Sequence, residues 1–506
     1  MLTLKFSVVF ISFLAFLILA NIFFNKLLQR LFSFEEDVLP QLSWGLLVYF
    51  LIFRLARWLA LPVIPIMILY EIVSIASFIF LSLWLVQKIF NSERKWLASN
   101  IYRYGKFSLP LLLAFMIFVS LGAYLEFPSD PTLHLQSIQA WEKVIYMNFG
   151  LGSKVYDRFI YFFQHWLLRY SDLNVGARSG LTLVGAMFQT MLVWQFVRIT
   201  KLLTNNTLLG WLGGLMSIGY FGYDAFSFYR YTALGGATIA QISCLEGFIL
   251  IISTFLKEEI KYLSLLPLIL FFCYGNHEQE TLLQLNAIVG ISFLMLIFRR
   301  RQFTQKMVRV MTFIVVSALS FMVYSFITKK PLLVNLIDIP NGDFMLTNLF
   351  EINGHQIIIH NFAMLNTMTG FLGWCLAILA VILLLLNESH RKLDVMGAIT
   401  AWPWIILLNP IGIKLLERYI PSVVFHRLIY GSLYWLFPII ALPYLARLIS
   451  RNWPLNYDSQ ASEYLVSNLN SNLITYFSVS LLIVLSFNPN FPVQGKMSHF
   501  FFRPEP

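Results

Sequence analysis

Long apolar runs follow one another from end to end of this chain, and short polar connections separate them. A run of about 20 apolar residues crosses the hydrocarbon core of a bilayer as a helix. The pattern therefore predicts an all-α, polytopic integral membrane protein with about fourteen (roughly 12–14) transmembrane helices. The predicted spans lie near residues 4–24, 40–58, 62–87, 107–126, 177–197, 207–226, 234–256, 262–274, 281–298, 310–328, 362–387, 396–412, 428–446 and 472–488.

The beginning of the chain is the least regular part of this pattern. Arg54 and Arg57 interrupt the span at 40–58, so we expect any error in the number of helices before residue 90. The apolar run Leu2–Phe24 lacks the strongly basic start and the small-residue cleavage site of a signal peptide. It is interpreted as a retained helix.

Lysine and arginine gather in alternate connections. The basic connections are 88–106, 198–201, 257–261, 299–309, 391–392 and 447–451. Because cytoplasmic loops of membrane proteins are enriched in these residues, the face that carries them is predicted to be cytoplasmic. The extracytoplasmic face then receives 128–176, 227–233, 275–280, 329–361, 413–427 and the tail after residue 488.

Composition agrees with a membrane protein. Hydrophobic residues make up 58% of the chain and charged residues 12%, which is about half the charged fraction of a soluble domain. The net charge of +11 follows from the basic connections, which also attract anionic membrane lipids. No soluble basic domain is present, so nucleic-acid binding is not expected. Cys244, Cys273 and Cys375 have neither a disulfide framework nor metal-ligand spacing.

The spans divide the chain into three predicted parts. Residues 1–105 form an N-terminal transmembrane module. Residues 106–450 form a transmembrane core with two large external loops, 128–176 and 329–361. Residues 451–506 hold a cytoplasmic connection, a last transmembrane helix and an external tail. The loop 329–361 either covers a site or is an ordinary connection.

Reactive side chains concentrate on the predicted extracytoplasmic face. Seven of the eight histidines are assigned to it, and only His390 is cytoplasmic. Two stretches are the densest: Glu126–His134, which opens the longest polar connection, and Gly275–Glu280. This distribution is typical of a protein that acts on something at the outer membrane surface.

The step Ser129-Asp130-Pro131 predicts the start of a helix, because Asp is a strong N-cap residue and Pro suits the first helical position. The amphipathic helices expected at about 131–147 and 154–170 would lie in the membrane interface. His134 follows Asp130 by one helical turn, on the same face. Asp130 either only caps its helix or also serves as a general base or metal ligand, and the two roles are compatible.

The sequence His277-Glu278-Gln279-Glu280 presses three ionisable groups against the bilayer, which is costly unless they serve a purpose. They are candidates to bind a divalent metal with Asp130 or to hold a sugar through its hydroxyls; a solvated turn is the alternative. A zinc protease motif is excluded because the position four residues after His277 is Thr281.

An acidic residue at the start of a large external loop, set on a bundle of about a dozen helices, resembles the GT-C class of membrane glycosyltransferases. The resemblance covers about residues 107–450 and is architectural. It implies a polyprenyl-phosphate-linked sugar as donor and a base or metal-binding role for Asp130. In this class the acidic loop usually follows the first span. In this chain it follows the fourth predicted span, so about three additional spans come before that one. Residues 1–105 would then be an added module.

The chemistry of glycosyl transfer fits other residues of the chain. A carboxylate must accept the proton of the acceptor hydroxyl, a role open to Asp130, with His134 beside it. Cations must stabilise the departing phosphate. Arg230 and Arg427 are candidates, because the arginine fork binds two phosphate oxygens; snorkelling to the headgroups is the alternative for each. A divalent cofactor such as Mg²⁺ or Mn²⁺ would bind among Asp130, His277 and Glu280.

Three functions compete at this point. The first is a glycosyltransferase of the cell envelope, in a bacterial inner membrane, with its active face extracytoplasmic and a glycan, lipid or protein as acceptor. The second is a transporter or lipid flippase, which places charged residues deep within spans; Glu246, inside an apolar run, is the main example. The third is a surface-polysaccharide polymerase or ligase, for which Arg418, His426 and Arg427 in the connection 413–427 are the relevant residues.

Overall fold

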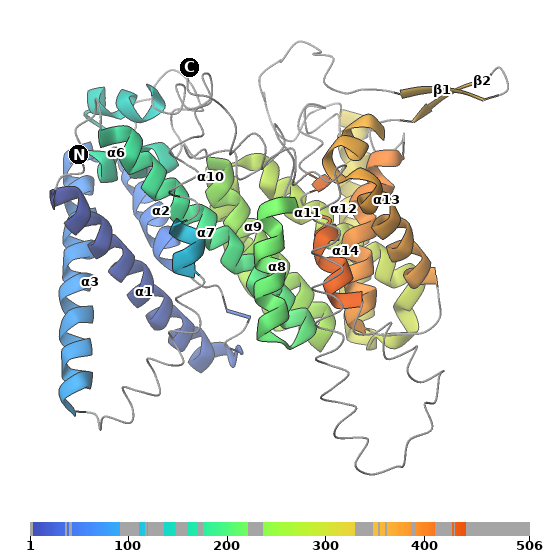
Figure 1. The fold of residues 1–506 in the computed structure, drawn as a ribbon, viewed down its shortest axis with the longest axis horizontal. Coiled ribbons are helices and arrows are strands. Elements are labelled where there is room, and N and C mark those ends of the chain that lie inside the picture. Colours follow the sequence, from blue (N-terminus) through green and yellow to red (C-terminus); the bar gives the residue numbers. More distant parts are fainter. Residues whose placement is uncertain are drawn as a thin grey trace. The chain divides into compact units, whose positions relative to one another are not determined.

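The computed structural model describes residues 4–35, 38–39, 43–91, 111–116, 119, 136–147, 159–169, 176–220, 236–328, 348–352, 355–359, 362–385, 391–409, 428–429 and 431–441. These residues form helices and one two-stranded hairpin (Figure 1). The chain divides into two compact units. Unit 1 comprises Met1–Gln195, Tyr229–Leu250 and Lys261–Thr281, and unit 2 comprises Phe196–Phe228, Ile251–Ile260 and Leu282–Pro506.

The elements follow in this order: α1 (Leu4–Phe32), α2 (Ser43–Trp58), α3 (Val63–Asn91), η1 (Trp141–Lys143), α6 (Phe159–Leu168), α7 (Gly176–Thr204), α8 (Thr207–Tyr220), α9 (Gly236–Lys257), η4 (Ile260–Leu265), α10 (Leu266–Asn276), α11 (Glu278–Arg299), η5 (Arg300–Gln302), α12 (Gln305–Thr328), β1 (Asn348–Ile352), β2 (His355–Ile359), α13 (Phe362–Leu385), α14 (Arg391–Leu408) and η7 (Tyr434–Leu436). The strands pair antiparallel, with Asn348 opposite Ile359 and Ile352 opposite His355.

A helix occupies each predicted span from 4–24 to 396–412 except 107–126. The span 107–126 lies largely outside the described residues, and the span 472–488 lies entirely outside them. Five helices in the described part are long and apolar enough to cross a membrane: Leu4–Phe32, Val63–Gln87, Leu183–Thr204, Thr238–Lys257 and Glu280–Gln302. The protein is therefore helical and has the helices of a membrane protein. The number of about fourteen spans stays a prediction.

In unit 1, α1 packs against α2 and α3 (Figure 1). Aromatic rings fill the space between them and α6. The Phe13 and Phe163 ring centroids lie 5.0 Å apart, those of Tyr49 and Tyr70 lie 4.2 Å apart, and the Trp166 ring is 5.3 Å from that of Tyr70. Edge-to-face and tilted contacts of this kind add to the gain from burial.

Helix α6 corrects one expectation. A helix is present within the predicted range 154–170, but no water-facing side is found: every side chain from Phe159 to Leu168 is buried. His165 is among these buried residues, at 8% exposed. Burial, with a smaller contribution from the positive charge of Arg169, lowers its pKa from the ordinary value to about 4. The histidine is therefore neutral at pH 7, and α6 is a core helix of unit 1.

Two connections of unit 1 meet at one end of its helices. The Val63 N–H donates to the Ile145 carbonyl and the Met147 N–H donates to the Leu61 carbonyl, each at 2.9 Å. The expected helix 131–147 therefore ends at Lys143, and an extended segment follows it. Residues 144–147 belong to the predicted external loop 128–176, and this pairing places the connection between α2 and α3 beside them.

A second set of contacts joins two further connections of unit 1. The Lys261 ammonium donates to the Ser33 carbonyl at 3.2 Å, and the Tyr262 hydroxyl donates to the Glu35 carboxylate at 3.4 Å. The connection after α9, residues 257–261, is predicted to be cytoplasmic, and these bonds place the connection after α1 beside it. The assignment of these connections to the cytoplasmic face stays a prediction.

In unit 2, three basic connections predicted to be cytoplasmic share hydrogen bonds. Arg391 forms an ion pair with Glu258 at 2.6 Å and donates to the carbonyls of Leu256 and Gln302. The Thr304 N–H donates to the other oxygen of Glu258 at 2.9 Å. Arg391 also lies against the ring of Phe303. Their meeting supports the assignment of these connections to one face.

A buried ion pair lies in the same unit. The Arg299 guanidinium is 2.9 Å from the Asp394 carboxylate and donates to the carbonyls of Leu383 and Leu384. Arg299 and Asp394 are 3% and 4% exposed. A buried charge needs such partners to offset its lost hydration. The pair ties the ends of α11, α13 and α14 together.

We expect the predicted sidedness to be measurable by thiol labelling. Gly150→Cys and Met345→Cys, in the two external loops, should react with an impermeant maleimide in intact cells, or in spheroplasts if an outer membrane is present. Arg301→Cys, on the basic face, should react only after the membrane is broken. The native chain supplies the background from its three cysteines. Labelling of positions 150 and 345 only in broken membranes would reverse the topology.

The Glu258 contacts predict a dependence of stability on pH. Burial raises the pKa of this carboxyl, but the bonds from Thr304 and the charge of Arg391 outweigh it, so the net pKa lies below the ordinary 4.5. A lowered folded-state pKa stabilises the protein above pH 4.5, and this gain disappears as the pH falls through the folded value. The melting temperature should therefore differ between wild type and Glu258→Gln at pH 7, and the difference should shrink below pH 4.5. A difference in melting temperature between the two proteins that does not change with pH would contradict this prediction.

Candidate functional site

The junction between α10 and α11 in unit 1 is the densest group of ionisable side chains that the structure describes at a predicted external position. Helix α10 ends at Asn276, α11 begins at Glu278, and His277 alone connects them. His277 is extended, with φ −159° and ψ 118°, and its N–H donates to the Cys273 carbonyl at 2.8 Å. The predicted six-residue connection 275–280 is therefore almost entirely helical.

Carboxylates suit the start of α11 because the helix dipole favours negative charge there. The Glu280 carboxylate is 2.5 Å from the His277 Nδ1. The Glu280 side chain is fully buried, whereas 12% of the His277 side chain is exposed. The solvated turn that was the alternative interpretation is therefore excluded for Glu280. A carboxylate at Nδ1 fixes the tautomer and orientation of an imidazole.

Two buried thiols, Cys273 and Cys244, belong to the same unit as Glu280. The Cys273 thiol, on α10, donates to the Ala240 carbonyl of α9 at 3.4 Å. Glu280 acts electrostatically on both Cys273 and Cys244. No role was predicted for these cysteines. Their position inside apolar runs gave no signal, and only the pairing of α9 with α10 brings them to the site.

The site is packed tightly against α2. A Cβ added at Gly275 would come within 2.2 Å of the Phe50 ring and 3.3 Å of the Arg54 guanidinium. The Phe50 ring also contacts Phe159 of α6 and Phe271 of α10, with centroids 5.7 and 5.4 Å apart. Helix α6, which is part of the predicted loop 128–176, therefore packs near α10, the helix that ends at Asn276.

The other predicted site residues are not placed. Asp130, His134, Arg230 and Arg427, as well as the side chain of Glu278, lie outside the described residues. The expected cleft shared by Asp130 with His277 or Glu280 stays a prediction. Among the described residues, no group of three His, Cys, Asp or Glu side chains is arranged to hold a metal ion. His277 and Glu280 supply two adjacent groups, so a metal there would need further ligands.

A second polar cluster of unit 1 lies within the helices. The Glu246 carboxylate accepts hydrogen bonds from the Ser43 hydroxyl of α2 and, at 3.1 Å, from the Gln195 amide of α7. Glu246, Ser43 and Gln195 are all buried, at 1%, 2% and 0% exposed. The sequence showed Glu246 inside an apolar run but gave no indication of its partners. The contacts join α2, α7 and α9.

Glu246→Leu should lower the thermal stability of the purified protein strongly. The substitution leaves the buried Ser43 and Gln195 donors without this acceptor, at about 1–3 kcal/mol for each group. Glu246→Gln keeps the shape and one acceptor oxygen and should cost less. Melting temperatures in one detergent give the comparison. Equal melting temperatures for wild type and Glu246→Leu would show that these hydrogen bonds do not stabilise unit 1.

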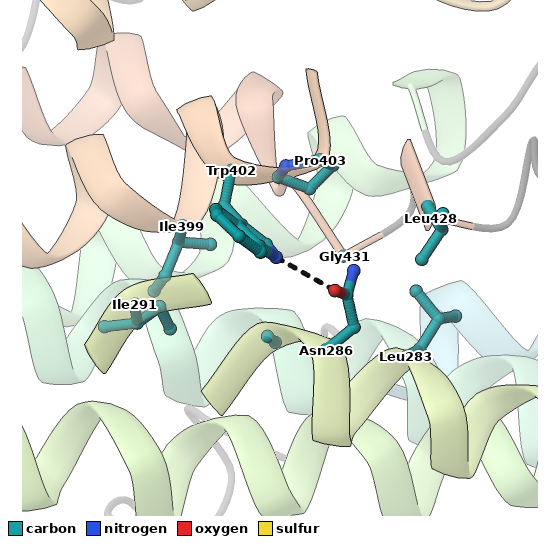
Figure 2. A pocket seen from close by; sticks show the side chains of 9 residues that line it. Leu283, Asn286, Ile291, Ile399, Trp402, Pro403, Leu428 and Gly431 are labelled. Atoms are coloured by element: carbon teal, nitrogen blue, oxygen red, sulfur yellow. Dashed lines mark hydrogen bonds between the residues drawn. The ribbon is translucent and has the colours of Figure 1, made fainter. Parts of the chain in front are cut away.

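Unit 2 contains a small cavity between α11 and α14. Figure 2 shows the Trp402 indole donating to the Asn286 side-chain oxygen across it, at 3.1 Å. Its lining comprises Leu283, Asn286, Ala287, Ile291, Ile399, Trp402, Pro403, Leu428 and Gly431. The space is about 10 Å³, enough for a single water molecule. A Cβ at Gly290 would meet the Trp402 ring at 2.1 Å, so glycine is required for this contact.

This cavity gives Trp402 a role that the sequence analysis did not assign. Its ring is part of the packing between α11 and α14, and its N–H is hydrogen-bonded to Asn286. The cavity is also lined by Leu428, which directly follows the predicted phosphate-binding residue Arg427. As it stands, the space is too small for a sugar, so the junction at His277 is the stronger candidate site.

Compared with the sequence profiles of known families and with curated proteins, the chain matches none.

Proposed function

We propose that this protein is a membrane glycosyltransferase that takes a sugar from a polyprenyl-phosphate-linked donor and transfers it at the extracytoplasmic face. The observation that carries the proposal is the His277–Glu280 pair, a buried carboxylate against a partly exposed imidazole. It lies at helix ends that the basic connections assign to the outer face. Ionisable groups at such a depth are costly and usually functional.

The roles divide by chemistry. Asp130 accepts the proton of the acceptor hydroxyl, with His134 one turn away. Glu280 orients His277 toward the sugar or its phosphate, while Arg230 and Arg427 bind the phosphate oxygens. Glu278 is a further sugar-binding residue. A divalent cation, where one takes part, would add charge stabilisation at the phosphate. The setting we propose is the cell envelope, with the protein in a bacterial inner membrane and a glycan, lipid or protein as acceptor.

A donor assay tests the proposal. The purified protein in detergent is incubated with polyprenyl-phosphate sugars of several kinds and with membrane extract as the source of acceptor. We expect release of polyprenyl phosphate and labelled product from one of these donors, and no product from nucleotide sugars. Absence of transfer from every polyprenyl-phosphate sugar, by protein shown to be folded, would overturn the proposal.

A transporter or lipid flippase is the second candidate, because one observation favours it. Glu246 lies deep within α9 and is held by Ser43 and Gln195 from two other helices. Such intramembrane carboxylates often mark a transport path. If this function holds, Glu246→Gln abolishes lipid or solute movement across reconstituted vesicles, and donor hydrolysis is not detected. If the first proposal holds, Glu246→Gln keeps transferase activity in proportion to the folded protein.

A further inference from the structure

Helix α12 in unit 2 has one narrow packed side. Met307, Met311 and Val315, spaced four residues apart, are buried. Much of the rest of the helix is open. The exposed large side chains and their exposed fractions are Phe313 (73%), Val316 (52%), Leu319 (53%), Val323 (57%) and Tyr324 (62%). An open groove runs along this side, lined by Val316, Leu319, Ser320, Val323 and Tyr324.

The same side of α12 begins with positive charge. Lys306 and Arg309 are exposed and three residues apart, and Phe313 follows Arg309 by four residues, so all three lie on one helix face. Arg300 and Arg301, in the preceding η5 turn, are exposed as well. In the part of the chain that the structure describes, none of these four cations forms an ion pair. The nearby acid Glu258 is already bonded to Arg391.

The length of the exposed apolar side of α12 matches the thickness of one leaflet of a bilayer. From Phe313 to Tyr324 the helix rises about 16 Å, at 1.5 Å per residue. One leaflet of the hydrocarbon core is about 15 Å thick. A lipid whose headgroup lies at Lys306 and Arg309 would therefore have room for an acyl chain along the whole groove.

We infer that this face of α12 is a binding site for an anionic phospholipid. The phosphate and any further negative charge of the headgroup bind Lys306 and Arg309, with Arg300 and Arg301 close by in sequence, and the acyl chain lies in the groove that ends at Tyr324. The four cations, which form no ion pair among the described residues, favour an anionic over a zwitterionic headgroup, since each basic residue near the surface adds about 1 kcal/mol. A second copy docked symmetrically about an axis normal to the membrane would bring the four cations of each copy together.

Lipid selectivity tests the inference in the full-length protein. The protein is reconstituted in vesicles of phosphatidylcholine with a trace of spin-labelled phosphatidylglycerol or spin-labelled phosphatidylcholine. The association constant of each lipid is measured by electron paramagnetic resonance. We expect selectivity for phosphatidylglycerol, and a loss of up to roughly thirtyfold in its affinity for the site in K306Q/R309Q. Ser320→Phe, which fills the groove without changing charge, should weaken both labelled lipids.

The control removes equal charge elsewhere. Lys26 and Arg30 are exposed at the end of α1 and four residues apart. K26Q/R30Q should keep the selectivity if the site is on α12. Equal losses in both double variants would show a diffuse effect of basic loops and overturn the inference. So would equal affinity for the two lipids in the wild type, or a dimer that dissociates when Ser320 is replaced by Phe, because the groove would then be a contact between copies.

Discussion

Asp130→Asn is expected to lower the rate of sugar transfer by about a hundredfold to ten-thousandfold while the protein stays folded in the membrane. The range is that of a lost general base. Asparagine has nearly the size of aspartate and caps a helix as well as aspartate does. The substitution therefore removes the proton acceptor and keeps the helix start that Ser129-Asp130-Pro131 predicts.

Asp130→Ala supplies the comparison. If Asp130 only caps its helix, the alanine variant loses stability and the asparagine variant keeps nearly normal activity. If Asp130 is the base, both variants lose activity, and the asparagine variant melts at the wild-type temperature. The measurement is the initial rate from a polyprenyl-phosphate sugar, with the melting temperature of each purified protein. Wild-type transfer by Asp130→Asn would remove Asp130 from the mechanism.

Apolar length predicted the positions of helices well, because a long apolar run has few ways to satisfy its backbone in a membrane other than a helix. Helix ends were predicted less well. Helix α1 continues eight residues past the predicted end at residue 24, to Phe32, since Asn25, Lys26 and Gln29 do not break a helix. It stops where Ser33 takes a positive φ of 52°.

Tertiary partners set the limit of what the sequence predicted. The run Phe159–Leu168 contains polar residues at 164 and 165, which favoured a surface position, yet both are buried. Aromatic rings from α1, α2 and α3 contact their neighbours Phe163 and Trp166. The ionisable cluster at 277–280 was predicted, but the burial of Glu280 was not. Helix α9 lies close to this cluster: the Cys273 thiol donates to the Ala240 carbonyl, and Glu280 acts electrostatically on Cys244, although both residues of α9 lie far from Glu280 in sequence. Contacts of this kind leave no trace in local periodicity.

His277→Ala is expected to lower the transfer rate by about a hundredfold, at the weak end of the range for a lost acid–base or positioning group. Glu280 acts through His277, because its carboxylate contacts Nδ1 and its own side chain is fully buried. Glu280→Gln keeps an oxygen that can accept from Nδ1 but loses the charge, so it should retain more activity than His277→Ala.

Glu280→Leu completes the series and separates a positioning role from a structural one. It removes both the charge and the acceptor, so its transfer rate should fall to that of His277→Ala. The double variant with Glu280→Leu and His277→Ala should be no slower than either single variant, since the effects of residues that act as a unit are non-additive. Glu142→Gln, which alters an exposed carboxylate beyond the site, should leave the rate unchanged. Initial rates, with the folded fraction of each variant measured by gel filtration in detergent, give the answer. If the double variant loses the product of the two single effects, His277 and Glu280 act independently, and the pair is not the unit that the 2.5 Å contact indicates.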